Sequence, residues 1–228
     1  MAHPLTHSAT VVGTGPARRR GPAYRVETER LIARCWSPAD AALLRAALDD
    51  NDQHLRPWIP WMRDEPKPIE ETTLWLRRAR AGFDSDTEYR YGLFEPGEER
   101  LVGETSLFKR VGPNAREIGY WIDRHHGGRG LATEAAAAMV RVAFEIERVE
   151  RVEIHHSAEN TASAAVPNRL GFTLDATLRR RALDSDDVVR DLSVWTLFAD
   201  EYPESPASRI AIFAYDCTGA PLPLPGPG

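Results

Sequence analysis

The chain has 228 residues, of which 42% are hydrophobic, and its formal net charge is −5. This length and composition are typical of one globular domain with a sizeable core. The acidic balance argues against nucleic acid as a partner, because phosphate attraction drives most nucleic-acid binding. The only two cysteines, Cys35 and Cys217, are far apart and lack CxxC spacing. They argue against a disulfide scaffold and favour a reducing, cytoplasmic compartment.

The two ends of the chain differ in composition from its centre. Residues 1–23 contain glycines and a basic run but no apolar core, which predicts a flexible tail. Residues 24–200 are predicted to form the folded domain, and 201–228 a C-terminal extension. Within it we expect an extra strand at 209–215 and a disordered, proline-rich end at 221–228. No window approaches the roughly 18 apolar residues of a membrane-spanning helix, so no membrane partner is expected.

The first predicted elements are a strand and two helices. Residues 30–35 are predicted to form the strand. Ser37 as N-cap and Pro38 at the first helical position predict a helix over 39–48. Residues 70–83 have the apolar spacing of an amphipathic helix.

Three strands and a helix follow. The strands 89–94, 101–109 and 117–123 are separated by turn sequences rich in glycine and proline, which predicts an antiparallel meander. Apolar residues recur at helical spacing from 131 to 146. This pattern predicts a helix that buries one stripe against the sheet.

The remaining elements alternate between strand and helix. A short strand is predicted at 152–155, a helix at 161–170 that ends at Gly171, and strands at 172–178 and 192–198. Strands and helices thus mix in one chain, which indicates the α+β class.

A glycine-rich loop leads from the last meander strand into the helix that begins near Leu131. Glycine leaves backbone amides open to a ligand, and a helix N-terminus adds unpaired N–H donors that favour anions. We predict that the amides of Gly127, Gly128 and Gly130 hold a pyrophosphate and that Arg129 adds a direct charge. On this stretch alone, an ordinary connecting loop remains an open alternative. The loop matches neither the Walker phosphate loop nor the GxGxxG dinucleotide pattern.

Four sequence blocks occur in a fixed order and spacing: EIGYWID at 117–123, GRGLATEA at 128–135, ENTAS at 159–163 and RLGF at 169–172. With the segment HLRPWIPW at 54–61, they resemble the GNAT acetyltransferases of the ribosomal-protein (RimJ/RimL-like) branch. The resemblance spans about residues 26–200. It implies the GNAT fold, with a mixed, mostly antiparallel central sheet of about six or seven strands and about four flanking helices.

The resemblance also implies the reaction and its cosubstrate. An acetyl group would pass from acetyl-CoA to a primary amine, either a protein N-terminus or a small amine such as an antibiotic. The pantetheine arm would lie between the strands at 117–123 and 152–155, with a main-chain N–H near Trp121 or Ile122 polarising the acetyl carbonyl and Asn160 binding the pantetheine amides. The implied cofactor-binding loop comprises Gly127, Gly128, Arg129, Gly130, Leu131, Ala132 and Thr133.

One departure from the family pattern concerns this loop. The family motif Arg/Gln-x-x-Gly-x-Gly/Ala would begin at position 127, where this chain has Gly127. No side chain contributes there, so we expect backbone amides and Arg129 to carry the binding. The departure leaves open a CoA-binding module of the same fold without turnover. A different donor, such as succinyl-CoA, is a further alternative.

Three side chains are candidates for the chemistry. Glu117 is a candidate general base for the acceptor ammonium, with an exposed strand-end charge as the alternative. Asp175 lies where branch members often carry glutamate and is a second candidate base. Ser163, by resemblance, is a hydrogen-bond donor near the cofactor sulfur. Helix capping is the alternative role for both Ser163 and Asn160. Residues 166–168 offer no tyrosine acid, so protonation of the thiolate by Ser163 or by water stays open.

Two tryptophans, Trp58 and Trp61, lie three residues apart around Pro60. They are predicted to cover the acceptor cleft, and packing as a lid or in the core is the alternative.

No metal site is predicted. The histidine pairs at 125–126 and 155–156 lack HxH or HExxH spacing. A homodimer is a further expectation that the resemblance brings.

Overall fold

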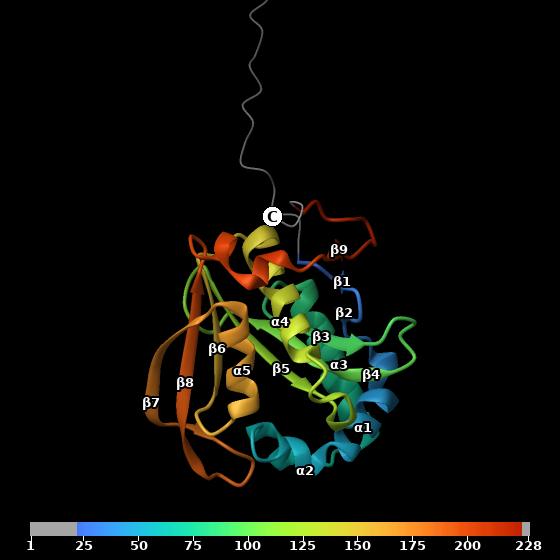
Figure 1. Ribbon diagram of the computed structural model, residues 1–228. Coiled ribbons are helices and arrows are strands. Elements are labelled where there is room, and N and C mark those ends of the chain that lie inside the picture. The colour runs from blue at the N-terminus through green and yellow to red at the C-terminus, as the bar shows by residue number, and fades with distance from the viewer. Residues whose placement is uncertain (1–21, 225–228) are drawn as a thin grey trace, which may run out of the picture.

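The computed structural model describes residues 22–224. They fold around one sheet, in which nine strands follow the order β7-β8-β6-β5-β4-β3-β2-β1-β9 (Figure 1). Every neighbouring pair is antiparallel except β5 and β6. The predicted α+β class and mostly antiparallel sheet are confirmed. The sheet exceeds the expected six or seven strands because the short β1 and β9 extend one edge.

The strands are β1 (Arg25–Glu27), β2 (Ile32–Cys35), β3 (Tyr89–Phe94), β4 (Leu101–Phe108), β5 (Ala115–Ile122), β6 (Arg151–Ser157), β7 (Thr173–Leu183), β8 (Val189–Phe198) and β9 (Phe213–Tyr215). The α-helices of the described residues are α1 (Ala41–Asp50), α2 (Asp52–Leu55), α3 (Ile69–Asp84), α4 (Leu131–Arg141) and α5 (Thr161–Leu170). Four of these helices were predicted, and the fifth, α2, is a single turn.

The chain enters α1 through the predicted cap. The Ser37 hydroxyl accepts a hydrogen bond from the N–H of Ala39 (3.3 Å), and the Asp40 carboxylate accepts one from the N–H of Ser37 (2.8 Å). This reciprocal pair forms a capping box. The first turn, Pro38–Asp40, is 3₁₀-helical, so α1 itself begins two residues later than predicted.

The helix predicted at 131–146 has two parts. Residues 131–141 form α4, and Val142–Ile146 continue it as a π-helical turn. Small alanines dominate the part that packs on the sheet, and Ala135 through Val140 are all buried. Short side chains let the helix lie close to the strands, which fixes the position of its N-terminus.

Successive residues of β5 face different hydrophobic clusters. Trp121 belongs to the cluster shared with α1 and α3, whereas Tyr120 and Ile122 pack against the larger cluster that includes α4. Because side chains alternate along a strand, these clusters lie on opposite faces of the sheet. Figure 1 shows α4 and α3 on the two sides accordingly.

β5 and β6 separate along their length. They pair in parallel only where Ala115–Glu117 meet Arg151–Glu153, whereas β6 pairs with β8 along its whole length. Within the described residues, the edge of β5 beyond Glu117 that faces β6 therefore has no strand partner. This splaying of the two strands, between which the pantetheine arm is predicted to lie, leaves backbone groups of β5 open beside α5.

Both ends of the described chain are packed. Ala23 is fully buried, and its carbonyl accepts a hydrogen bond from the Tyr91 hydroxyl (2.9 Å). Leu222 is buried, and its N–H donates to the carbonyl of Ala214 in β9 (2.7 Å). The predicted disordered end is therefore wrong for Leu222, because β9 offers it a backbone partner. Most of the predicted N-terminal tail and residues 225–228 lie outside the described residues, and the division into domains stays a prediction.

Candidate active site

A cleft of about 410 Å³ lies among the N-terminal ends of α4 and α5, the free edge of β5 and the α2 segment. All but one of the predicted cofactor-binding residues line it: Trp121, Ile122, Gly127, Gly128, Gly130, Leu131, Ala132, Thr133, Asn160 and Ser163. The wall also includes side chains that sequence reasoning did not assign to the site: His54, Tyr120, His126 and Arg169.

The loop before α4 has the backbone geometry of an anion cradle. Gly128 (φ +73°) and Gly130 (φ +79°) are both left-handed, a conformation that side chains disfavour. Gly130 is the N-cap of α4 and offers no side chain to the first N–H groups of the helix. A Cβ at Gly128 would meet nothing within 4 Å, so the space beside the loop is open. The N–H of Gly127 donates to the carbonyl of Arg124 (3.5 Å), so the amides left for an anion are those of Gly128, Gly130 and the first turn of α4. Together with the positive end of the helix dipole, they form an environment that fits a pyrophosphate.

Arg129 is the one predicted loop residue outside the cleft wall. Its side chain is exposed, and its carbonyl accepts a hydrogen bond from the Arg30 guanidinium (2.9 Å). Arg30 also donates to Glu134 in the first turn of α4 (2.6 Å). Arg30 thus ties the outer side of the loop to α4, and the guanidinium that does line the cleft belongs to Arg169 of α5.

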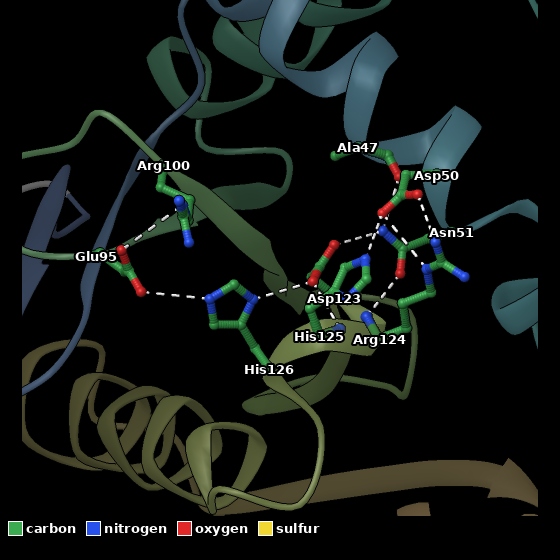
Figure 2. A network of polar contacts seen from close by, with 9 residues as sticks. All are labelled: Ala47, Asp50, Asn51, Glu95, Arg100, Asp123, Arg124, His125 and His126. Atoms are coloured by element: carbon green, nitrogen blue, oxygen red, sulfur yellow. Dashed lines mark hydrogen bonds and ion pairs between the residues drawn. The ribbon is translucent and has the colours of Figure 1, made fainter.

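A buried polar network holds the start of this loop against α1 (Figure 2). Asn51 is fully buried, and its side-chain amide donates to the Asp123 carboxylate (2.7 Å). The Asn51 side-chain oxygen accepts a hydrogen bond from the N–H of Arg124 (2.7 Å). The side chain of Asn51 thus forms hydrogen bonds with both a carboxylate and a backbone amide of the loop. Asn51 and Asp123 are 72 positions apart in the sequence.

Asp123 and His126 continue the network into the cleft wall. Asp123 accepts from the N–H of His125 (2.9 Å), and its Oδ1 lies 3.0 Å from Nδ1 of His126. The other ring nitrogen of His126 faces Glu95 at 3.3 Å, as Figure 2 shows. Burial raises the pKa of Asp123, but hydrogen bonds from Asn51 and His126 lower it, and the net pKa lies below its usual range. The loop is therefore fixed by an ionised carboxylate.

Asn160 and Ser163 open α5 on the opposite wall. The Asn160 side chain accepts a hydrogen bond from the N–H of Ser163 (3.0 Å), so Asn160 is the N-cap of the helix. The capping alternative is thus confirmed for Asn160, and its predicted contact with pantetheine stays a prediction. The Ser163 hydroxyl lies 3.0 Å from the hydroxyl of Tyr120. Tyr120 could have been found from the sequence. It is adjacent to the predicted Trp121 in the strand, and adjacent side chains of a strand lie on opposite faces of the sheet.

Glu117 lies at the last position at which β5 pairs with β6, where the two strands begin to separate. It is buried, so the alternative of an exposed strand-end charge is wrong. Arg110 donates to its carboxylate (Nε to Oε2, 2.7 Å), and Nδ1 of His155 lies 3.8 Å away. Glu117 does not line the cleft, and its role as a base stays a prediction.

Asp175, the second candidate base, lies on the edge strand β7. It is exposed and sits where the register between β7 and β8 shifts, so it bulges from the ladder. It does not line the cleft either.

The two predicted acceptor tryptophans are equally exposed, at 37%, but only Trp58 lines the cleft. Trp61 lines a separate cavity of about 160 Å³ together with Trp75 and Glu104. A 3₁₀ turn begins at Pro60 between the two tryptophans, and it places them on different surfaces.

The tip of the β7–β8 hairpin holds the segment that carries Trp58. The N–H of Ser185 donates to the carbonyl of Arg56 (3.2 Å), and Arg63 forms an ion pair with Asp187 (2.6 Å). Both residues of that ion pair are exposed. The acceptor side of the cleft is thus fastened by an exposed ion pair and by a backbone hydrogen bond from buried Ser185.

Two further properties concern residues 22–224 alone. No three His, Cys, Asp or Glu side chains among them are grouped as metal ligands would be. None of their helices is long and apolar enough to cross a membrane.

The splayed strands, the glycine cradle and the helix-capping Asn160 beside Ser163 together define the class of acetyltransferases. The Acetyltransferase (GNAT) domain family matches residues 30–173. This chain belongs to the GNAT acetyltransferase family, as its sequence blocks predicted.

Curated relatives support this assignment over different lengths. The [ribosomal protein uS5]-alanine N-acetyltransferase of Escherichia coli (strain K12) is 29% identical over 162 residues, which are 68% of this chain and 81% of that protein. YdaF of Bacillus subtilis (strain 168) is 31% identical over 76% of this chain and 94% of its own length. YjcK of the same organism is 33% identical over 99 residues, so this chain spans only 55% of that protein.

Solved structures share the fold. RimJ of Mycobacterium smegmatis, in complex with CoA-disulfide, has a TM-score of 0.69 at 26% identity and covers 80% of this chain and 91% of its own. RimL, a ribosomal L7/L12 alpha-N-protein acetyltransferase in complex with coenzyme A, has a TM-score of 0.69 at 21% identity over 76% of this chain and 97% of its own. At that identity the likeness to RimL shows the fold alone.

Proposed function

We propose that this chain transfers an acetyl group from acetyl-CoA to the α-amino group of a protein. The observation that carries the proposal is the cleft itself, in which the open amides before α4 continue into the free edge of β5 and reach the Ser163 hydroxyl. A pyrophosphate fits the amides before α4, and an extended pantetheine arm fits the free edge of β5. The thioester would then lie at the Ser163 hydroxyl. The CoA-disulfide complex of the RimJ relative supports the choice of cofactor.

The acceptor is proposed from the relatives. The E. coli relative acts on an alanine of ribosomal protein uS5, and this chain aligns with 81% of it. Trp58 and His54 line the cleft near its α2 wall, where an incoming peptide N-terminus would be covered. A small amine or an antibiotic is the alternative acceptor.

The proposed chemistry assigns one task to each group. A main-chain N–H near Trp121 or Ile122 polarises the acetyl carbonyl, and a base removes the ammonium proton so that the neutral amine attacks. Glu117 is the first candidate base, because it is buried at the point where β5 and β6 separate. Asp175 is the second. As the new C–N bond forms, the C–S bond breaks and its electron pair passes to sulfur, which Ser163 stabilises as a hydrogen-bond donor.

Thiol release tests the proposal directly. Acetyl-CoA would be incubated with the protein and a panel of amines: N-terminal peptides of ribosomal proteins, polyamines and aminoglycosides, with succinyl-CoA as a parallel donor. We expect free thiol with acetyl-CoA and at least one N-terminal peptide. Cofactor binding by calorimetry without thiol release from any amine would instead indicate a CoA-binding module.

The pH profile separates the two candidate bases. Glu117→Gln or Asp175→Asn is expected to lower turnover mainly at neutral pH and to recover in alkali, where the amine deprotonates without help. The variant that shows this recovery identifies the base. Flat profiles for both would remove both residues from the mechanism.

Two properties beyond the reaction are also proposed. The thiols of buried Cys35 and exposed Cys217 are both free in the structure, and a cytoplasmic location suits them. A homodimer is proposed from the family resemblance, and sedimentation of the purified protein tests it.

A further inference from the structure

Tyr120 lines the cleft, and within residues 22–224 its hydroxyl forms hydrogen bonds with one residue, Ser163. Its oxygen is 3.0 Å from the Ser163 hydroxyl oxygen and 3.2 Å from the Ser163 carbonyl oxygen. Both residues line the cleft, and they come from different elements, β5 and the first turn of α5. The contact thus joins the free edge of β5 to the helix that carries the proposed sulfur donor.

The two hydroxyls have one hydrogen atom each. These two hydrogens can serve three hydrogen bonds: one between the hydroxyls, one from Tyr120 to the Ser163 carbonyl, and one from Ser163 to the cofactor. If Tyr120 donates to the Ser163 carbonyl oxygen (3.2 Å), Ser163 can donate to the Tyr120 oxygen, so the serine hydrogen is used within the wall and none points to the cofactor. If Tyr120 donates to the serine oxygen, the serine hydrogen is free to reach into the cleft. This second arrangement forms a chain of hydrogen bonds in one direction, and each bond in such a chain strengthens the next.

We propose that Tyr120 is a positioning residue, which donates to the Ser163 hydroxyl oxygen and so directs the serine hydrogen to the cofactor sulfur. The inference rests on the proposed function. Sequence reasoning found no tyrosine acid at 166–168 and left the fate of the thiolate open. Tyr120 instead acts on the departure of the thiolate from its place in β5, through its hydrogen bond with Ser163.

The environment of Tyr120 suits a neutral donor. Burial raises its pKa to about 12, while the hydrogen bond with Ser163 acts in the opposite direction. The phenol therefore keeps its hydrogen throughout the neutral and mildly alkaline range. No proton has to leave Tyr120 during the reaction.

The bonds and charges balance without a further reactant. The C–S bond breaks as the C–N bond forms, and the sulfur receives the electron pair. The Ser163 hydrogen bond stabilises the resulting thiolate, and Tyr120 stabilises Ser163. The acceptor ammonium gives up one proton to the base before the attack and a second proton to solvent as the amide forms, and the released thiolate takes up a proton from solvent.

Tyr120→Phe removes only the hydroxyl and tests the inference in the full-length enzyme. We expect kcat to fall about tenfold, as for one lost hydrogen bond in the transition state, with the affinity for CoA unchanged in calorimetry. Tyr89→Phe is the matched control, because Tyr89 is a tyrosine of the same sheet whose hydroxyl donates to a neighbouring side chain, Asp86 (3.0 Å), and it does not line the cleft. This control should keep the wild-type kcat.

A double-mutant cycle with Ser163→Ala separates positioning from independent action. If Tyr120 acts through Ser163, then Tyr120→Phe lowers kcat no further in the Ser163→Ala background. Independent, multiplicative losses would overturn the inference, as would a weaker CoA affinity with unchanged kcat or a Tyr120→Phe enzyme as fast as the wild type. A wild-type protein that releases no thiol with any acceptor would overturn the proposed function first and this inference with it.

Discussion

The two walls of the cleft are held by different kinds of contact. On the cofactor side, buried groups fix the loop before α4: Asn51 is fully buried, and Asp123 and His126 are 7% and 6% exposed. On the acceptor side, the segment that carries Trp58 is fastened to the β7–β8 hairpin by the backbone hydrogen bond from Ser185 to Arg56 and by one side-chain ion pair, Arg63 with Asp187, whose side chains are 37% and 68% exposed.

This difference has an energetic meaning. Hydrogen bonds to a buried ionised group cost about 1–3 kcal/mol or more when one partner is removed, whereas exposed ion pairs contribute about 0–1 kcal/mol. A chain can therefore alter its acceptor wall by substitution at little cost in stability, while its cofactor wall tolerates few changes. The comparison predicts that substitutions on the two walls differ in both size and kind of effect.

Gly130→Val should have the largest effect, because a β-branched residue is strained at φ +79° and displaces the amides before α4. We expect CoA affinity to fall by at least about 100-fold, as for several lost hydrogen bonds to a charged group, and stability by roughly 1–2 kcal/mol. Calorimetry and denaturant unfolding measure the two effects. Gly97→Val is the matched control, since Gly97 is also left-handed (φ +98°) in open space and lies outside the cleft wall. Equal CoA affinity for both variants would contradict the cradle.

Asp123→Asn should follow in size. Removing the carboxylate weakens its contacts with Asn51 and His126, and we expect stability to fall by about 2 kcal/mol at neutral pH and CoA affinity by about tenfold. The folded-state pKa of Asp123 is lowered, so its contribution is present above the ordinary carboxyl pKa of 3.8 and is lost as the pH falls through the lower folded value. Unfolding curves of both proteins from pH 7 downward should therefore converge only below about pH 4. Parallel curves across that range would remove Asp123 as an ionised anchor.

Trp58→Ala should raise the KM for a peptide acceptor about tenfold, the loss expected for one buried aromatic contact, and leave CoA affinity unchanged. Trp61→Ala is the natural comparison, because both tryptophans are 37% exposed but only Trp58 lines the cleft. We expect Trp61→Ala to change the acceptor KM less than about twofold. Steady-state kinetics with one acceptor measure the KM of both variants. A larger rise in KM for Trp61→Ala than for Trp58→Ala would place the acceptor at the cavity lined by Trp61.

Arg63→Ala should have the smallest effect. It removes an exposed ion pair with Asp187, which contributes about 0.2–1 kcal/mol. We expect a change of less than about twofold in the acceptor KM and none in CoA affinity, both measured at low and at physiological salt. A large loss of CoA affinity would show that the two walls are not independent.

The sequence predicts what is periodic or local. The meander of β3, β4 and β5 and the helices α3, α4 and α5 follow from apolar spacing and turn residues, and their ends agree with the structure to within a few residues. The cradle is predicted from the glycines at 127, 128 and 130 only together with the flanking strand and helix and the other sequence blocks, because the glycines alone also suit an ordinary connecting loop. These features depend on neighbours in the chain.

The contacts that complete the site connect distant segments. Asn51 and Asp123 are 72 positions apart, and nothing around Asn51 marks it as a partner of the loop. The pairing of Glu117 with Arg110 spans a turn whose path the sequence does not define. The separation of Trp58 and Trp61 was missed because the 3₁₀ turn at Pro60 changes the direction of the chain between them.

The position of Asn51 has a consequence for how the two substrates bind. This residue ends α1, directly precedes α2 and binds both Asp123 and the backbone of Arg124. A shift of α2 during acceptor entry would therefore pull on the residue that anchors the cofactor loop. We expect the two substrates to influence each other's affinity, with equal coupling in both directions.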